Sequence, residues 1–192
     1  MNRIDDERVL FYLKHQQRIQ EWAALAKEAS EQAHQFLCSC ADDLMTLARD
    51  LGRGVQTFVS IEDDYPKLFL YRNAWWPDKA TTKHPRVGIG LEWRRGNVSF
   101  TESGKSAYCG VWVHYQLDGA KALHESIGKA FKDAGLLKKH GFTSSTVWWP
   151  AYRYEIAPPE FWNDLGPYRT QLIESIRFCW TTFEPVVNKL VR

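Results

Sequence analysis

Two carboxylate residues stand at positions where a divalent cation could be held. Asp78 follows Pro77, and Glu92 comes after a further thirteen residues, at the end of a stretch rich in strand-forming residues. Mg²⁺ and Mn²⁺ prefer oxygen ligands, and two convergent carboxylates are the minimum that holds such an ion. If the fold brings Asp78 and Glu92 together, we expect a metal-dependent hydrolysis site.

The same residues resemble a known nuclease motif. Pro77-Asp78 followed by Glu92-Trp93-Arg94 is similar to the PD-(D/E)XK pattern, although the resemblance covers only these few residues. In that family an Asp and a Glu on adjacent strands hold the metal, and a Lys two residues after the Glu helps to activate water. The resemblance implies a nuclease with Asp78, Glu92 and Arg94 as its site. Arg94 departs from the pattern because a guanidinium stays charged and cannot do the proton transfer of a Lys.

Two Trp-Trp-Pro sequences, at residues 75–77 and 148–150, suggest a different chemistry. The chain has 9 Trp, 8 Tyr and 10 Phe, and adjacent residues of a strand face opposite sides of the sheet. We therefore expect one indole of each pair in the core and the other in a groove that a small ligand, a peptide or a nucleobase could occupy. The expected ligand-binding residues are Trp76, Trp149, Tyr152 and Arg153. Packing of all these aromatic side chains in the core is the alternative.

Other reactive residues do not form a complete motif. Gly104-Lys105-Ser106 ends like a phosphate-binding loop, but Ser99 occupies the position of the first Gly and a strand pattern follows. His34 and Cys38 share a helix face, and two ligands do not make a zinc site. The main interpretation therefore has no catalytic residue, no metal and no cofactor, with Mg²⁺ or Mn²⁺ only in the nuclease alternative.

The spacing of apolar residues predicts the helices and strands that position these residues. No Gly or Pro occurs between Phe11 and Leu51, where apolar residues recur at steps of three and four, and Gly52 and Gly54 end the pattern. This region is one long helix or a hairpin broken near Ser30. Its apolar face needs a partner.

Strand and helix patterns follow along the rest of the chain. Four strands are predicted at 55–61, 67–75, 86–93 and 107–115, a helix at 119–134, a fifth strand at 146–156 and a last helix at 158–191. Pro158 and Pro159 are expected at the start of the last helix, with breaks or kinks at Pro167 and Pro185. The prediction is one α+β domain over 1–192: helical over 1–52, a meander with one helix over 55–156, and a C-terminal helix over 158–191.

Composition limits the class of protein. The 25 basic and 23 acidic residues leave a charge of +2, which does not indicate a nucleic-acid binder. Neither a signal peptide nor a membrane-spanning run is apparent, and the four cysteines lack disulfide or zinc spacing. We expect a soluble, cytoplasmic protein with reduced thiols.

The functional expectation is a non-enzymatic binding or interaction protein. It would act through the amphipathic helical surface and the aromatic groove, with a protein partner or a second copy of itself and no membrane contact. Nucleic acid stays an alternative partner. The alternative functions are the metal-dependent nuclease and a pocket for a small ligand or nucleobase.

Overall fold

A computed structural model gives the fold for residues 6–76, 79–102, 104–145 and 147–191. The elements are, in order, α1 (Glu7–Cys38), α2 (Ala41–Asp50), β1 (Val55–Ser60), β2 (Lys67–Arg72), the 3₁₀ helix η1 (Asn73–Trp75), β3 (Val87–Glu92), β4 (Tyr108–Val113), α3 (Ala120–Asp133), α4 (Leu136–Lys139), β5 (Ala151–Tyr154) and α5 (Gly166–Leu190). This order confirms the α+β fold class. Within those residues, no helix combines the length and the hydrophobicity needed to cross a membrane.

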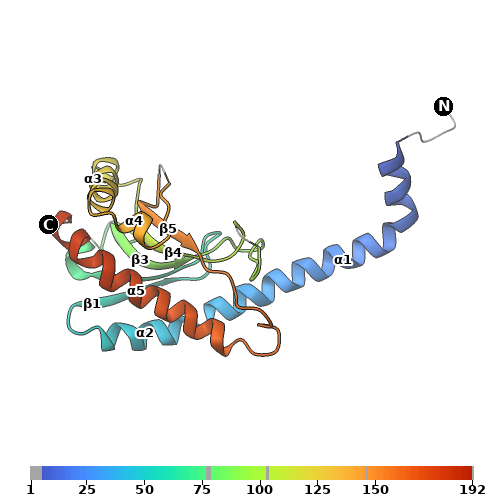
Figure 1. Ribbon diagram of the computed structural model, residues 1–192, viewed down its shortest axis with the longest axis horizontal. Coiled ribbons are helices and arrows are strands. Elements are labelled where there is room, and N and C mark those ends of the chain that lie inside the picture. The colour runs from blue at the N-terminus through green and yellow to red at the C-terminus, as the bar shows by residue number, and fades with distance from the viewer. Residues whose placement is uncertain (1–5, 77–78, 103, 146, 192) are drawn as a thin grey trace.

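The five strands form one antiparallel sheet in the order β1-β2-β3-β4-β5. Because side chains alternate along each strand, the sheet has two different faces. Leu68, Ile89 and Val111 point to one face and are fully buried. That face is covered by α2, which packs on β1 and β2, and by α5, which packs on β3 and β4, while α3 packs beside α5 (Figure 1).

The main core lies between this face and the helices. Leu44 and Leu47 of α2, together with Leu172, Ile176 and Phe183 of α5, are almost completely buried there. Burial of each such side chain contributes about 1.5–3 kcal/mol. The opposite side of the sheet carries a smaller, separate aromatic cluster, and we call that side the aromatic face.

The N-terminal helical region is broken, but not near Ser30. Helix α1 begins after Asp6, whose carboxylate accepts a hydrogen bond from the backbone N–H of Arg8, and it runs to Cys38. A turn at Ser39 and Cys40 then leads into α2. Figure 1 shows that α2 continues onward from the end of α1 instead of folding back along it. The alternative of a long N-terminal helix is therefore confirmed, although this helix ends at Cys38 and a second helix, α2, completes the predicted range.

The C-terminal helix begins later than predicted. It starts at Gly166, whose backbone N–H donates to the Asp164 carboxylate at 2.8 Å, and Pro167 occupies its first turn. The predicted start at residue 158 and the predicted break at Pro167 are therefore wrong. Helix α5 continues through Pro185, so it does not break there, and the alternative of a kink at Pro185 stays a prediction. Pro185 and Thr181, whose carbonyl loses a helical partner there, are both exposed, so water can satisfy that carbonyl.

The fifth strand is shorter than predicted and covers only residues 151–154. Trp148 and Trp149 precede it in a turn held by Ser145. The Ser145 backbone N–H donates to the Trp149 carbonyl at 2.8 Å, and the Ser145 hydroxyl accepts from the Trp149 N–H at 2.9 Å. Alternation along a strand therefore does not apply to this Trp pair.

Candidate functional site

The register of the sheet arranges the side chains of the aromatic face in rows. One row crosses from β2 to β5 through Lys67, Glu92, Tyr108 and Tyr154. The next row crosses through Phe69, Gly90, Gly110 and Tyr152. Directly opposite residues of neighbouring strands have Cβ atoms about 4.5–5.5 Å apart. The backbone alone therefore brings a charged row beside an aromatic row.

Glycines leave the middle of this face without side chains. A Cβ on Gly88 would lie 2.5 Å from the Phe69 ring, and a Cβ on Gly110 would lie 2.0 Å from the carbonyl oxygen of Ala151. Both distances are shorter than any real carbon contact. The Phe69 ring occupies the space above Gly88, and the backbone of β5 lies close to Gly110.

The rings contact one another in a continuous cluster. Phe69 lies with its ring centroid 5.4 Å from Trp112 and 6.0 Å from Trp149, and Tyr108 lies 4.9 Å from Trp149. Trp148 stacks on Trp112 with centroids 5.8 Å apart and planes inclined by 7°. Such packing holds the indoles in fixed orientations.

A pocket of about 630 Å³ opens against this cluster. It is lined by aromatic rings, two imidazoles and several polar side chains: Tyr65, Lys67, His84, Glu92, Arg94, Gly104, Tyr108, Trp112, His114, Gln116, Ser145, Val147, Trp148, Trp149, Tyr152 and Tyr154. Pockets for small ligands typically have volumes of about 300–1,000 Å³, apolar walls and a few placed polar groups. The volume and the lining both fit that description.

A buried ion pair belongs to the pocket lining. The Nζ atom of Lys67 lies 3.4 Å from a carboxylate oxygen of Glu92, and the side chains are 10% and 7% exposed. The Tyr108 hydroxyl donates a hydrogen bond to the other oxygen. Burial raises the pKa of Glu92, whereas Lys67 and hydrogen bonds from Tyr108 and Trp149 oppose that rise. Glu92 thus connects the charged row to two of the pocket's aromatic rings.

Two histidines contribute neutral polar groups. His84 and His114 have ring centroids 5.2 Å apart, and burial lowers the pKa of each imidazole, for His114 with a further contribution from His84. Their Nδ1 atoms are buried and find no hydrogen-bond partner among the described residues. His114 also lies nearly parallel to Trp112, at 5.3 Å. Burial therefore favours the neutral form of both rings.

Arg94 adds a positive charge to the lining. Its side chain is exposed, and no ion pair or hydrogen bond of its guanidinium is found within the described part of the chain. Lys67 and Glu92 neutralise each other, so Arg94 leaves the charged residues of the lining with a net charge of +1.

Of the ligand-binding residues expected from the sequence, Trp149 and Tyr152 line the pocket. Trp76 lies on the same face but outside the lining, with its ring against Phe58 and Tyr71. Its neighbour Trp75 is fully buried on the helix side, so this pair does separate across the sheet. Trp148 and Trp149 do not separate, because their turn places both indoles in the pocket.

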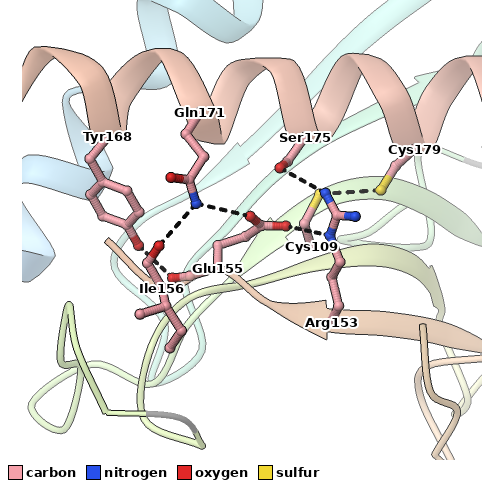
Figure 2. Close-up of polar contacts among 8 residues, drawn as sticks. All are labelled: Cys109, Arg153, Glu155, Ile156, Tyr168, Gln171, Ser175 and Cys179. Carbon is pink, nitrogen blue, oxygen red and sulfur yellow. Dashed lines mark hydrogen bonds and ion pairs between the residues drawn. The ribbon is translucent and has the colours of Figure 1, made fainter. Parts of the chain in front are cut away.

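Arg153 lies on the opposite face from the pocket. Since Tyr152 and Tyr154 point into the pocket, alternation along β5 directs Arg153 toward α5. Figure 2 shows it there, paired with Glu155 at 3.0 Å and donating to the Ser175 hydroxyl at 3.1 Å. The expectation that Arg153 lies beside the groove indoles is therefore corrected.

The rest of that network joins β5 and its following loop to α5. The Tyr168 hydroxyl donates to the Glu155 carbonyl at 2.7 Å, and the Gln171 amide donates to the Ile156 carbonyl at 3.0 Å (Figure 2). These contacts connect elements within the core. Arg153 accordingly has a structural role in this arrangement.

The nuclease alternative depends on Asp78 and Glu92. Asp78 lies outside the described residues, so the pairing of these two carboxylates stays a prediction. Glu92 is not the exposed carboxylate of an empty metal site, because Lys67 and Tyr108 already occupy its oxygens. Among the described residues, no group of three or more His, Cys, Asp and Glu side chains gathers as metal ligands.

Sequence reasoning missed Lys67, Tyr108 and His84 as pocket residues. The signal for Lys67 and Tyr108 was present in alternation, since Lys67 shares a face with Phe69 two positions later and Tyr108 shares a face with Trp112 four positions later. Alternation assigns these residues to a face, but the strand register is also needed to show that they lie together in one site. His84 lies in a loop between η1 and β3, where no periodicity points to a neighbour.

Comparisons of the chain with protein families, with curated proteins and with solved structures find no match.

Proposed function

We propose that this protein binds a planar aromatic ligand with a polar edge, of the nucleobase type, in the pocket of the aromatic face. The observation that carries this proposal is the lining itself. Indole and phenol rings from β4, β5 and the turn before β5 surround a cavity that also contains a buried Lys67–Glu92 pair. An aliphatic ligand would pack against the apolar walls, but it could not stack on the aromatic rings that the cluster holds in fixed orientations.

Stacking supplies the affinity in this proposal. Trp148 is half-buried and lines the pocket while its ring is held by Trp112, so it presents an oriented indole to a ligand. Stacking of a base on an aromatic side chain contributes about 1–3 kcal/mol. Tyr152 and Tyr154 offer further rings on the neighbouring strand.

Polar groups of the lining supply the selectivity. The Gln116 amide can donate and accept hydrogen bonds, and the imidazoles of His84 and His114 do so when neutral. These are the groups that read the donors and acceptors along the edge of a base. A ligand without such an edge leaves them without partners, which weakens its binding.

The charge of the lining favours a ligand with a negative substituent. Arg94 is exposed and has no acidic partner in the described structure, and guanidinium groups recognise phosphate by paired hydrogen bonds. A nucleotide matches both the aromatic rings of the pocket and the positive charge of Arg94. Its base would stack within the pocket, and its phosphate would lie near Arg94.

Calorimetric titration with the four nucleoside 5′-monophosphates tests this proposal, with ribose 5-phosphate as the non-aromatic control. We expect saturable binding of at least one nucleotide and none of the control. Trp148→Ala should weaken binding about tenfold or more, whereas Trp148→Phe should retain most of it. Trp162→Ala is the matched control, because Trp162 is 70% exposed and lies outside the lining.

Two outcomes would contradict the proposal. Equal affinity for ribose 5-phosphate would mean that the rings contribute nothing. Equal losses in Trp148→Ala and Trp162→Ala would mean that binding occurs elsewhere. Arg94→Gln adds a separate readout, since it should reduce the affinity for nucleotides while leaving that for the matching nucleosides unchanged.

A further inference from the structure

Most of helix α1 has no partner in the structure. Only the last turns of α1 pack on the rest of the molecule, through the buried residues Ser30, Ala33, His34 and Leu37. Residues 6–29 are exposed, apart from the half-buried Ile19. Figure 1 shows this segment extending away from the sheet and the other helices. We call residues 7–29 the free arm.

On the side by which α1 is packed, the free arm carries Phe11, Trp22 and Leu25, with Lys14 and Arg18 between the first two. Phe11, Trp22 and Ala33 are spaced by eleven residues, which is about three turns at 3.6 residues per turn, so they share one side of the helix. Ala33 is buried against the body of the protein. Trp22 and Phe11 are 64% and 60% exposed, and Leu25, three residues after Trp22, is 60% exposed.

Such a surface favours association. In water, helices owe most of their stability to packing of an apolar face, and exposed apolar stripes of this kind mark interfaces. The 23 residues from 7 to 29 follow a helical path about 35 Å long, which bends near its N-terminal end (Figure 1). That length separates the bodies of two molecules joined through their arms, so the bodies do not obstruct the contact.

The charges along α1 point to the occupant of this surface. Residues 7–18 carry three basic side chains and one acidic side chain, a net charge of +2. Residues 19–29 carry one basic side chain and two acidic side chains, a net charge of −1. Two such helices in antiparallel orientation place the positive half of each beside the negative half of the other. Parallel orientation places like charges together.

We propose that two copies of this chain associate through their free arms, paired antiparallel along the stripe of Phe11, Trp22 and Leu25. The apolar stripe supplies the contact, and the opposite charges of the two halves set the orientation. This inference is independent of the pocket, which lies on the sheet.

Sedimentation equilibrium of the full chain at several concentrations tests the proposal. We expect a monomer–dimer equilibrium whose Kd rises with ionic strength. The double substitution Trp22→Ala and Leu25→Ala should raise Kd at least about tenfold, because it removes the centre of the stripe. Trp162→Ala, the exposed Trp outside α1, should leave Kd unchanged.

Charge reversal tests the antiparallel orientation. Lys14→Glu with Arg18→Glu makes both halves negative, and Glu21→Lys with Glu28→Lys makes both halves positive. Each double variant should raise Kd at least about tenfold. In the variant with all four substitutions the two halves again carry opposite charges, so its Kd should be close to that of the wild type.

Three results would overturn the proposal. A wild-type protein that stays monomeric at every soluble concentration has no self-association to explain. Double variants with unchanged Kd, or a fourfold variant as weak as the double variants, would remove the charge argument. All substituted side chains are exposed, and circular dichroism checks that each variant keeps its helical content.

Discussion

The Lys67–Glu92 ion pair offers a quantitative test of the site because it is buried and because each partner can be substituted alone or together with the other. Its atoms lie 3.4 Å apart with little solvent contact, so removal of one partner leaves an uncompensated charge in the interior. Such a loss typically costs about 3–5 kcal/mol. We therefore expect Lys67→Met and Glu92→Met each to lower the free energy of unfolding by about that amount.

The double substitution should cost much less than the sum of the two single substitutions. With both charges gone, the remaining losses are the hydrogen bonds that Tyr108 and Trp149 make to Glu92 and the one that Lys67 makes to the Tyr65 carbonyl. Each buried donor or acceptor left unpaired costs about 1–3 kcal/mol. Urea unfolding followed by tryptophan fluorescence gives all four free energies of the cycle. Additivity to within about 0.5 kcal/mol would refute the coupling of the pair.

Three further predictions concern other residues. Burial lowers the pKa of His84 and His114 below 6.5 in the folded state, so the unfolded chain binds protons at a higher pH than the folded chain does. The free energy of unfolding should therefore fall as the pH drops through about 6.5. Urea unfolding at several pH values should show a smaller fall for His84→Asn than for the wild type. Gly110→Ala should destabilise by about 1–3 kcal/mol because its Cβ meets a neighbouring strand. Gly128→Ala on α3, whose Cβ would make only an ordinary contact of 3.9 Å with Pro150, should stabilise by about 0.5–1 kcal/mol, and thermal unfolding compares the two variants. Cys38, the one half-buried thiol among the cysteines, should react with iodoacetamide before the three buried thiols, as peptide mapping would show.

The fold class was predictable because its signals are local. Gly52 and Gly54 both adopt positive φ and end the helical region where the pattern stops. The strands at 55–60, 67–72 and 87–92 lie within the predicted ranges, since each is a short β-branched or aromatic run between turn residues. The boundaries that failed depended on local hydrogen bonds of side chains. At the start of α5, for example, Asp164 accepts from the Gly166 backbone N–H, six residues after the proline signal at residue 158.

The site was only partly predictable because it depends on pairing between strands. Lys67 and Glu92 are 25 positions apart in the sequence and directly opposite in the sheet. Alternation along a strand shows which face of the sheet each residue lies on, but only the pairing register of β2 and β3 shows that the two residues are neighbours. Trp148 and Trp149 were expected to point apart, and the turn at Ser145 directs both toward the pocket. That turn has no Gly or Asn signature in the sequence.

Indole N–H resonances in a ¹H–¹⁵N NMR spectrum test the aromatic pocket most directly, because the nine tryptophans give one signal each. The signals would be assigned by Trp→Phe substitutions and followed during titration with each nucleoside 5′-monophosphate. The proposed function predicts saturable shifts at Trp112, Trp148 and Trp149, which line the pocket, and none at the distant Trp22 and Trp162. Shifts confined to Trp22 and Trp162, or no shift with any nucleotide, would contradict it.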